Sequence, residues 1–174
     1  LRMTGIRALT LLSRFISTFF RGIPAVSVLM ILFFCVFTSR NTNALFVATL
    51  GYGLYSGAYV GEIFWTSLLS VEPRETEAAR MLGLTAWEAF TSVTLPQAWC
   101  NAKPVYTDSV ISLLQWTSVA SYISIVEMTK TVSNLAVRTG NAFFALFLSA
   151  LLYLALSWLI RGIFSIGKRR RAQA

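Results

Sequence analysis

The sequence predicts an all-α protein with several membrane-spanning helices, and three observations lead to that prediction. Hydrophobic residues make up 56% of the 174 residues and charged residues 13%, against about 45–50% and about a quarter in soluble domains. The apolar residues are gathered in long runs, whereas the basic residues lie between and beyond those runs. Backbone polar groups in lipid must be satisfied within the spanning segment, so each span is expected to be a helix.

Four segments have the composition of membrane spans, at about 23–38, 44–69, 105–126 and 142–164. Roughly 20 apolar residues cross a bilayer, so the last three are long enough and the first is marginal. The first gains length if its helix continues backwards through four apolar residues at helical spacing, namely Phe15, Ile16, Phe19 and Phe20. The chain starts at Leu1 with an arginine-rich stretch unlike a signal peptide, and we expect its N-terminus to be truncated.

The basic residues predict the orientation in the membrane. If both ends and segment 71–103 face the cytoplasm, twelve of the fifteen Lys and Arg residues lie inside, and Arg40, Lys130 and Arg138 lie outside. This is the asymmetry of the positive-inside rule, so we expect a multi-pass protein with a cytoplasmic C-terminus. The basic tail at 168–171 is suited to anionic membrane lipid. Basic residues scattered between apolar runs give no reason to expect nucleic acid as a partner.

Several kinds of chemistry are excluded by residues that the sequence lacks. It has no His and two Cys, so an ordinary zinc or haem site and a His-dependent catalytic triad cannot be built. No G-x-x-x-x-G-K-[ST] phosphate loop occurs, so the chain cannot hydrolyse ATP by that route. We therefore expect no zinc or haem site, no His-dependent triad and no phosphate loop in this chain.

Between the second and third spans, the sequence predicts two short helices joined by a glycine turn. Pro73 suits the first position of a helix, and Gly83 is a natural helix stop. Thr85 and Glu88 then have the spacing of a capping box, which predicts the start of a second helix. We expect that helix to end near Leu95-Pro96, because proline cannot continue it.

These residues carry a specific resemblance. Segment 71–103 contains Glu77-Ala78-Ala79, Gly83 and Val93-Thr94-Leu95-Pro96 at every spacing of the EAA loop of ABC-importer permeases. In that family the loop sits in a groove of the cytoplasmic ATPase and passes its closure to the membrane helices. The resemblance implies that the coupling residues are Glu77, Ala78, Ala79, Arg80, Gly83, Leu95 and Pro96. The alternative that remains open is an amphipathic elbow on the membrane surface.

Other stretches, at 21–24, 56–63, 112–118 and 153–157, resemble the polar amino-acid permeases of the histidine, glutamine, glutamate and arginine types. The resemblance implies that residues 1–174 are one transmembrane domain of an ATP-driven importer in a bacterial cytoplasmic membrane, working by alternating access. It also implies that this chain is not an enzyme and binds no cofactor or metal itself. Its implied partners are an ATPase dimer that holds ATP and Mg, a second identical or homologous permease subunit, and an extracytoplasmic solute-binding protein. Such permeases usually have five helices, so we expect the first to be missing here.

Two departures from that family bear on the substrate. Trp65 stands three residues after Glu62 where Arg is common, and Gln115-Trp116 stand where Lys-Asp is common. Either the substrate is less charged, or this chain is the non-binding half of a heterodimer. The third span has a polar stripe along one face, formed by Ser112, Gln115, Ser118 and Tyr122. It either lines the substrate path or joins this helix to another. The predicted path residues are Glu62, Trp65, Ser112, Gln115, Trp116 and Ser118.

Small and acidic residues in the second span have more than one interpretation. Gly53, Gly57 and Gly61 recur every four residues, which favours packing within or between subunits over a place in the path. Glu62, an acid within a predicted span, either gates the path or bonds to another helix. Two rival functions remain open: a proton-coupled secondary transporter that uses Glu62, and a membrane anchor that transports nothing.

Overall fold

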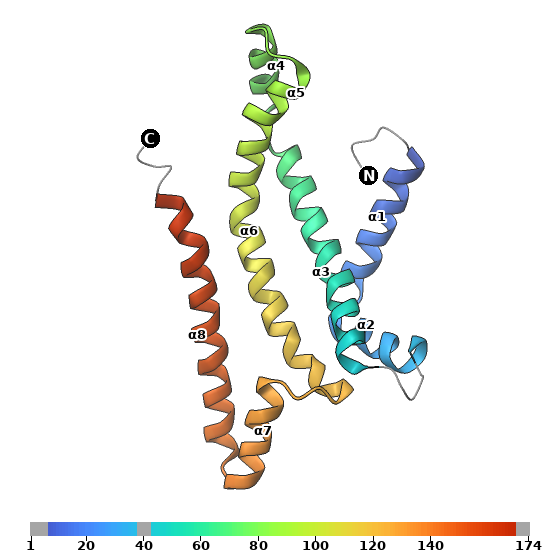
Figure 1. Ribbon diagram of the computed structural model, residues 1–174, viewed down its shortest axis with the longest axis vertical. Coiled ribbons are helices and arrows are strands. Elements are labelled where there is room, and N and C mark those ends of the chain that lie inside the picture. The colour runs from blue at the N-terminus through green and yellow to red at the C-terminus, as the bar shows by residue number, and fades with distance from the viewer. Residues whose placement is uncertain (1–6, 38–42, 170–174) are drawn as a thin grey trace. The chain divides into compact units, whose positions relative to one another are not determined.

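The computed structural model describes residues 7–37 and 43–169, and every regular element in those residues is helical (Figure 1). The all-α prediction is therefore confirmed. Four of the basic residues used to predict orientation, Arg2, Arg40, Arg170 and Arg171, lie outside the described residues. In order, the elements are α1 Arg7–Gly22, α2 Ala25–Ile31, the π-helical η1 Leu32–Val36, α3 Ala44–Leu69, α4 Pro73–Met81, α5 Ala86–Ala89, the π-helical η2 Phe90–Thr94, α6 Leu95–Trp116, the 3-10 helix η3 Thr117–Ile123, α7 Met128–Thr139 and α8 Ala142–Arg169.

Among the described residues, one uninterrupted helix is both long and apolar enough to cross a membrane, at Ala142–Ser165 in α8. The number rises to three if each of two bent helix pairs forms one span. The 26-residue α3 is not among these candidates. It contains four glycines, three tyrosines and Glu62, which dilute its aliphatic residues. The count of four spans therefore stays a prediction.

Two prolines bear on the predicted helix ends. The first span does not continue backwards as one helix, because α1 ends at Gly22 and α2 begins after Pro24. The sequence predicts that Pro96 ends a helix, and this prediction is wrong. Pro96 is instead the second residue of α6. The backbone N–H of Leu95 bonds to the Phe90 carbonyl in a π turn, and the chain continues as α6. Proline is tolerated in the first turn of a helix, where its missing N–H costs little.

The described chain divides into two compact units, each treated by itself: residues 1–21 with 57–109, and residues 22–56 with 110–174. The second unit has a small core in which α2, α3 and η3 meet, at Leu29, Ala48 and Ile123. Close by, the Tyr52 hydroxyl donates a 2.8 Å hydrogen bond to the Trp116 carbonyl, which joins α3 to the end of α6.

Residues 128–139 form a helix, α7, in a segment that the sequence analysis treated only as an outer loop. Glu127 begins it by accepting hydrogen bonds from the backbone N–H groups of Thr129 and Lys130 at 2.6 and 2.8 Å. The Tyr153 hydroxyl of α8 lies 3.0 Å from the Thr129 hydroxyl and 3.4 Å from the Glu127 carboxylate. These bonds hold α7 along the start of α8.

Candidate functional site

The turn between α4 and α5 closes as the sequence predicts. Gly83 has a φ of +92°, a left-handed value that glycine adopts without strain. Its N–H bonds to the Arg80 carbonyl at 3.1 Å, and the Leu84 N–H bonds to the Ala79 carbonyl at 3.4 Å. Together these are the two hydrogen bonds of a Schellman motif, which satisfies the last carbonyls of α4. The glycine stop is therefore confirmed.

The capping box at the start of α5 is also confirmed. The Thr85 backbone N–H and hydroxyl both donate to the Glu88 carboxylate, at 2.8 and 2.7 Å, and the Thr85 hydroxyl accepts from the Glu88 N–H at 3.3 Å. The backbone bond from Thr85, and next its side-chain bond, hold the pKa of Glu88 below its ordinary value. Donors directed at the charged carboxylate favour that form.

The E-A-A residues face in different directions. Ala79 is buried, as is Ala89 on α5, whereas Glu77, Ala78 and Arg80 are exposed. Alanine has almost no side chain, so α4 can pack closely on the helix that follows it. The exposed residues Glu77, Ala78 and Arg80 are therefore accessible on the surface of α4, whereas buried Ala79 contributes to the packing of the loop.

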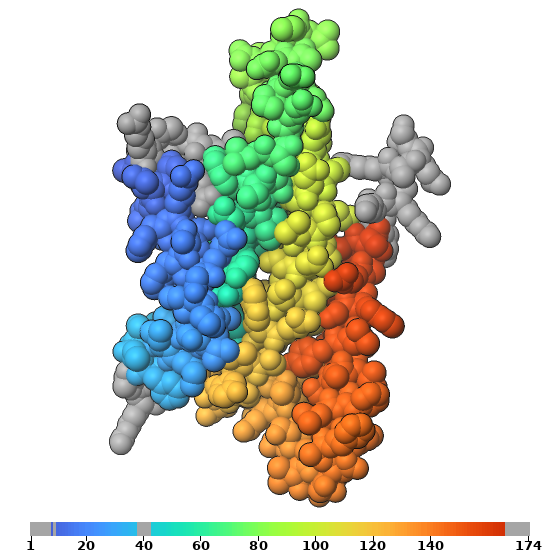
Figure 2. Space-filling model, turned by 180° about the vertical axis from the view of Figure 1, so that it is seen from behind, coloured from blue at the N-terminus to red at the C-terminus, as the bar shows by residue number. Residues whose placement is uncertain are grey.

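Three large apolar side chains stand out from this otherwise polar segment, and the sequence analysis missed them. Met81, Leu82 and Trp87 are 87%, 83% and 72% exposed, and we name them the apolar tip. Figure 2 shows the α4–α5 segment extending past the neighbouring ends of α3 and α6. The missed signal was a Met-Leu pair just before the glycine stop, with a tryptophan just after the cap. Large exposed apolar side chains that lie close together in sequence make this segment a candidate interaction site.

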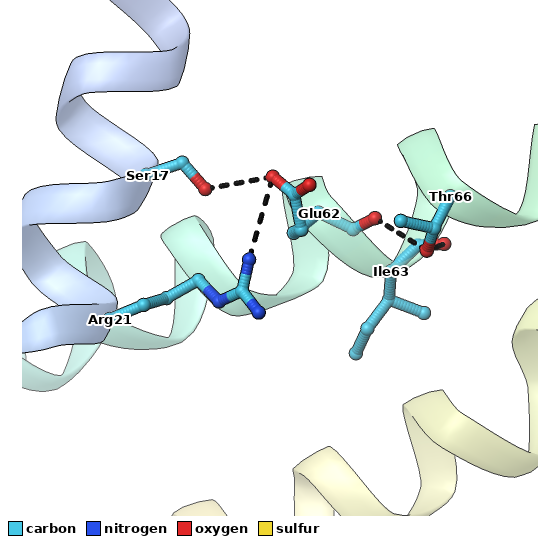
Figure 3. Close-up of polar contacts among 5 residues, drawn as sticks. All are labelled: Ser17, Arg21, Glu62, Ile63 and Thr66. Atoms are coloured by element: carbon cyan, nitrogen blue, oxygen red, sulfur yellow. Dashed lines mark hydrogen bonds and ion pairs between the residues drawn. The ribbon is translucent and has the colours of Figure 1, made fainter.

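Glu62 lies in a polar cluster that joins α1 to α3 (Figure 3). The Ser17 hydroxyl donates to the Glu62 carboxylate at 3.0 Å, and an Arg21 guanidinium nitrogen lies 3.8 Å from the same oxygen. The Arg21 guanidinium also lies over the Tyr59 ring, 5.6 Å from its centre. Intramembrane charges are usually paired in this way. Trp65 is partly buried one turn further along α3.

A groove of about 390 Å³ lies in the second unit, along α6 and α8, and predicted path residue Gln115 is part of its lining. Trp116 instead packs edge-on against Tyr55, with ring centres 4.6 Å apart. Ser118 donates its hydroxyl to the Gln115 carbonyl at 2.7 Å, and Ser112 is partly buried outside the lining. Sequence reasoning missed the polar lining of α8, whose four-residue spacing was the available signal: Tyr153, Ser157 and Arg161.

The glycine stripe makes no packing contact among the described residues. A Cβ built on Gly53, Gly57 or Gly61 would meet nothing within 4 Å, and all three are exposed. Packing of this stripe within or between subunits stays a prediction. Among the described residues, close packing on an α3 glycine occurs at Gly51, where a Cβ would lie 3.2 Å from the Leu32 side chain.

Comparison with known proteins gives consistent results. Residues 6–172 match the family described as binding-protein-dependent transport system inner membrane component. The chain is 30% identical to a probable amino-acid ABC transporter permease protein, YckA, of Bacillus subtilis, over 89% of this chain and 69% of that one. It is 26% identical to a putative glutamine transport system permease protein, GlnP, of Rickettsia felis, over 94% and 76%.

Two further similarities cover nearly the whole chain. The L-cystine transport system permease protein TcyL of Bacillus subtilis is 27% identical over 97% of this chain and 74% of its own length. A crystal structure of an amino acid ABC transporter with histidines superposes with a TM-score of 0.84 at 26% identity, over 97% of this chain and 79% of that one. The chain therefore belongs to the family of inner membrane components of binding-protein-dependent transport systems.

Proposed function

We propose that this permease carries an amino acid across the cytoplasmic membrane and that segment 71–103 is its cytoplasmic coupling loop. The names of the relatives, which refer to amino-acid, glutamine and L-cystine transport, support the substrate class. In this proposal residues 1–174 form one transmembrane domain with four spans of a five-helix permease, and the C-terminus is cytoplasmic.

The observation on which this proposal rests is the apolar tip. Met81, Leu82 and Trp87 are exposed in a segment whose neighbours are mostly charged or polar. Burying such side chains against another apolar surface is favourable, and it contributes about 25 cal/mol of binding free energy per Å² of apolar area removed from water. We propose that the tip docks in a groove of a partner ATPase, with exposed Glu77 and Arg80 as polar neighbours at its rim.

The mechanism follows from that docking. The permease pairs with itself or with a homologous subunit, so that two loops meet two ATPase subunits. ATP and Mg bound by the partner close the ATPase dimer and draw the two loops together. The membrane helices then switch from inward-open to outward-open and accept substrate from an extracytoplasmic solute-binding protein. Interactions that differ between the two states are what allow one site to bias the other.

The substrate path is proposed to follow the groove between α6 and α8. Gln115 and Arg161 supply amide and guanidinium groups there, and Ser157 and Tyr153 supply hydroxyls. A mixture of polar groups and apolar walls is typical of small-molecule sites. The Arg21–Glu62 cluster favours a bond between helices for Glu62, since the acid already has a cationic partner on α1.

The test compares the apolar tip with a matched apolar residue elsewhere. We reconstitute the importer in proteoliposomes with its ATPase and binding protein, and compare Leu82→Ser with Val137→Ser on α7, whose side chain is equally exposed at 82%. Substrate-stimulated ATP turnover should collapse for Leu82→Ser and persist for Val137→Ser. If Leu82→Ser leaves substrate-stimulated turnover unchanged, the tip does not dock in an ATPase groove, the membrane elbow is favoured and the proposal is wrong.

A further inference from the structure

The two arms that carry the α4–α5 tip are joined by side-chain hydrogen bonds that no motif predicted. One arm is the end of α3 with α4, and the other is η2 with the start of α6 (Figure 1). Asn101 donates its amide to the Ser70 hydroxyl at 2.9 Å, and Gln97 donates its amide to the Glu75 carboxylate. Nearer the tip, the Thr76 and Thr94 hydroxyls lie 2.9 Å apart. We name these three bonds the polar ladder.

The register of the ladder is that of two antiparallel helical arms. Each step up the first arm, from Ser70 to Glu75 and Thr76, is matched by a step down the second, from Asn101 to Gln97 and Thr94. On the second arm these positions share one helix face, because residues three and four apart are neighbours. The bonds therefore act at successive levels along a single seam.

Small residues lie on that same face of the second arm. Ala98 and Ala102 are 2% and 0% exposed, and they alternate with Gln97 and Asn101. Small side chains let two helices approach closely, which brings the short polar groups of Ser70, Thr76 and Thr94 within hydrogen-bond distance.

Beside the ladder, an aromatic cluster also joins α3 to α6. The Phe64 ring of α3 stacks on Trp99 of α6, with centres 5.6 Å apart, and lies 6.2 Å from the Tyr106 ring. The Trp99 and Tyr106 rings are themselves 6.5 Å apart. Stacked and tilted aromatic pairs hold their rings in a fixed mutual geometry. The connection between the two arms thus runs from the tip into α3 and α6.

We propose that the polar ladder makes the coupling loop and the adjoining ends of α3 and α6 move as one body. Its members are positioning residues, since they act on the membrane helices through the arms and touch neither substrate nor nucleotide. This inference rests on the proposed coupling function of the loop. Two of the three bonds are exposed and the Thr76–Thr94 bond is partly buried, and a single hydrogen bond makes only a modest net contribution to folding. Their loss should therefore leave the subunit assembled and let the tip move without carrying α3 and α6 along.

The first test removes one bond without changing side-chain shape. Thr76→Val and Thr94→Val delete a hydroxyl and keep a β-branched side chain, and Ser92→Ala deletes a neighbouring hydroxyl outside the ladder. In reconstituted importer, both Val variants should keep substrate-stimulated ATP turnover and lower the substrate imported per ATP by roughly fivefold or more. The double variant should be no worse than either single one, because the same bond is lost. An unchanged amount of substrate imported per ATP in the two single Val variants and in the double variant would overturn the inference.

The second test makes the connection reversible. In a chain whose own two cysteines, Cys35 and Cys100, are replaced by Ala, Thr76→Cys and Thr94→Cys together place two thiols where the hydroxyls are 2.9 Å apart. Oxidation should form a disulfide, since such geometry brings the Cβ atoms close enough. Import per ATP should be high when the disulfide is formed and fall on reduction of the same sample. Failure to form the disulfide, or an equal ratio in both states, would contradict the ladder.

The apolar-tip variant separates this inference from the function on which it rests. Leu82→Ser should abolish stimulation of ATP turnover, whereas ladder variants should keep stimulation and lose import. If Leu82→Ser has no effect, the coupling function itself is wrong. If Leu82→Ser acts as expected and the ladder variants import normally per ATP, the tip couples without the ladder and the inference alone is wrong.

Discussion

The Arg21 guanidinium lies 3.8 Å from the Glu62 carboxylate, so the acid of α3 has its counter-charge on α1. Ser17, one turn before Arg21, donates a hydrogen bond to the same carboxylate oxygen. A cation and a hydroxyl of α1 thus hold the acid of α3. The cluster joins two helices that are separated in sequence by the whole of α2.

We expect Glu62→Gln to reduce stability without changing the energy source of transport. The amide keeps an acceptor for Ser17 and loses the attraction of Arg21. Because both side chains are partly exposed, Arg21 at 44% and Glu62 at 22%, the loss in the free energy of unfolding should be only about 0.5–1 kcal/mol. Thermal unfolding of the purified subunit in detergent measures this loss of stability. The charge swap, Arg21→Glu combined with Glu62→Arg, should recover part of the lost stability. Uptake that followed a proton gradient and ceased in Glu62→Gln would contradict this interpretation.

Substitutions at Gly83 should rank by their tolerance of left-handed backbone. A Cβ there meets nothing within 4 Å, so the penalty is conformational and about 1–2 kcal/mol for an ordinary residue at this φ of +92°. Asn tolerates positive φ better than Ala, and Val tolerates it worst. Substrate-stimulated ATP turnover should fall in the order Gly, Asn, Ala, Val. Equal turnover in Asn and Val variants would show that the turn does not need this conformation.

The capping box at Thr85 should make the start of α5 sensitive to acid. The folded pKa of Glu88 is lowered by the Thr85 bonds, so their stabilisation is present above the unfolded pKa and is lost as pH falls through the folded pKa. Amide hydrogen exchange at residues 85–89, corrected for the intrinsic pH effect, should show protection that decreases in that acidic range. Glu88→Gln should lack the pH dependence, and its persistence there would assign the effect to another group.

If substrate passes along the α6–α8 groove, Gln115 should be accessible from water. In a chain without native cysteines, Gln115→Cys should react with a membrane-impermeant maleimide, and substrate should slow the reaction. Ser112→Cys, on the same helix but outside the groove lining, is the control. Equal reactivity at both positions, with no substrate protection, would exclude the groove as the path.

The exposed glycine stripe of α3 should matter only where a second subunit packs on it. Gly57→Leu adds bulk in open space, so the single subunit should fold, but close approach of another helix should be blocked. Cross-linking or mass measurement in detergent should then show fewer permease dimers. Gly162→Leu on α8, also in open space, is the matched control. Dimers at wild-type abundance in Gly57→Leu would remove the stripe from the interface.

Short-range chemistry was predictable from the sequence, because a few neighbouring residues decide it. The Gly83 stop and the Thr85–Glu88 capping box each depend on residues within four positions. Pro96 was misread because the same residue that ends a helix in its interior fits the first turn of a new one. Helix α7 was missed because Glu127 is not among the favoured capping residues, although it caps the helix here.

Long-range pairs in the site could not be read from one sequence. Nothing local shows that Arg21 meets Glu62, or that Gln97 meets Glu75 on the other arm of the loop. Gln115 was predicted to line a path and does line a groove, whereas its neighbour Trp116 is directed at Tyr55. Polarity identifies which helix turns are important, but the packed structure determines the direction in which each side chain points.

The exposure of Met81 and Leu82 has a consequence for how the cell disposes of incomplete importers. Exposed loop tips with small residues are preferred sites of proteolytic cleavage, and the Gly83 turn is exposed. A permease without its ATPase would offer this turn for cleavage, and a docked ATPase would shield it. If the tip docks as proposed, the segment that meets the ATPase would thus also set the lifetime of an unassembled permease subunit.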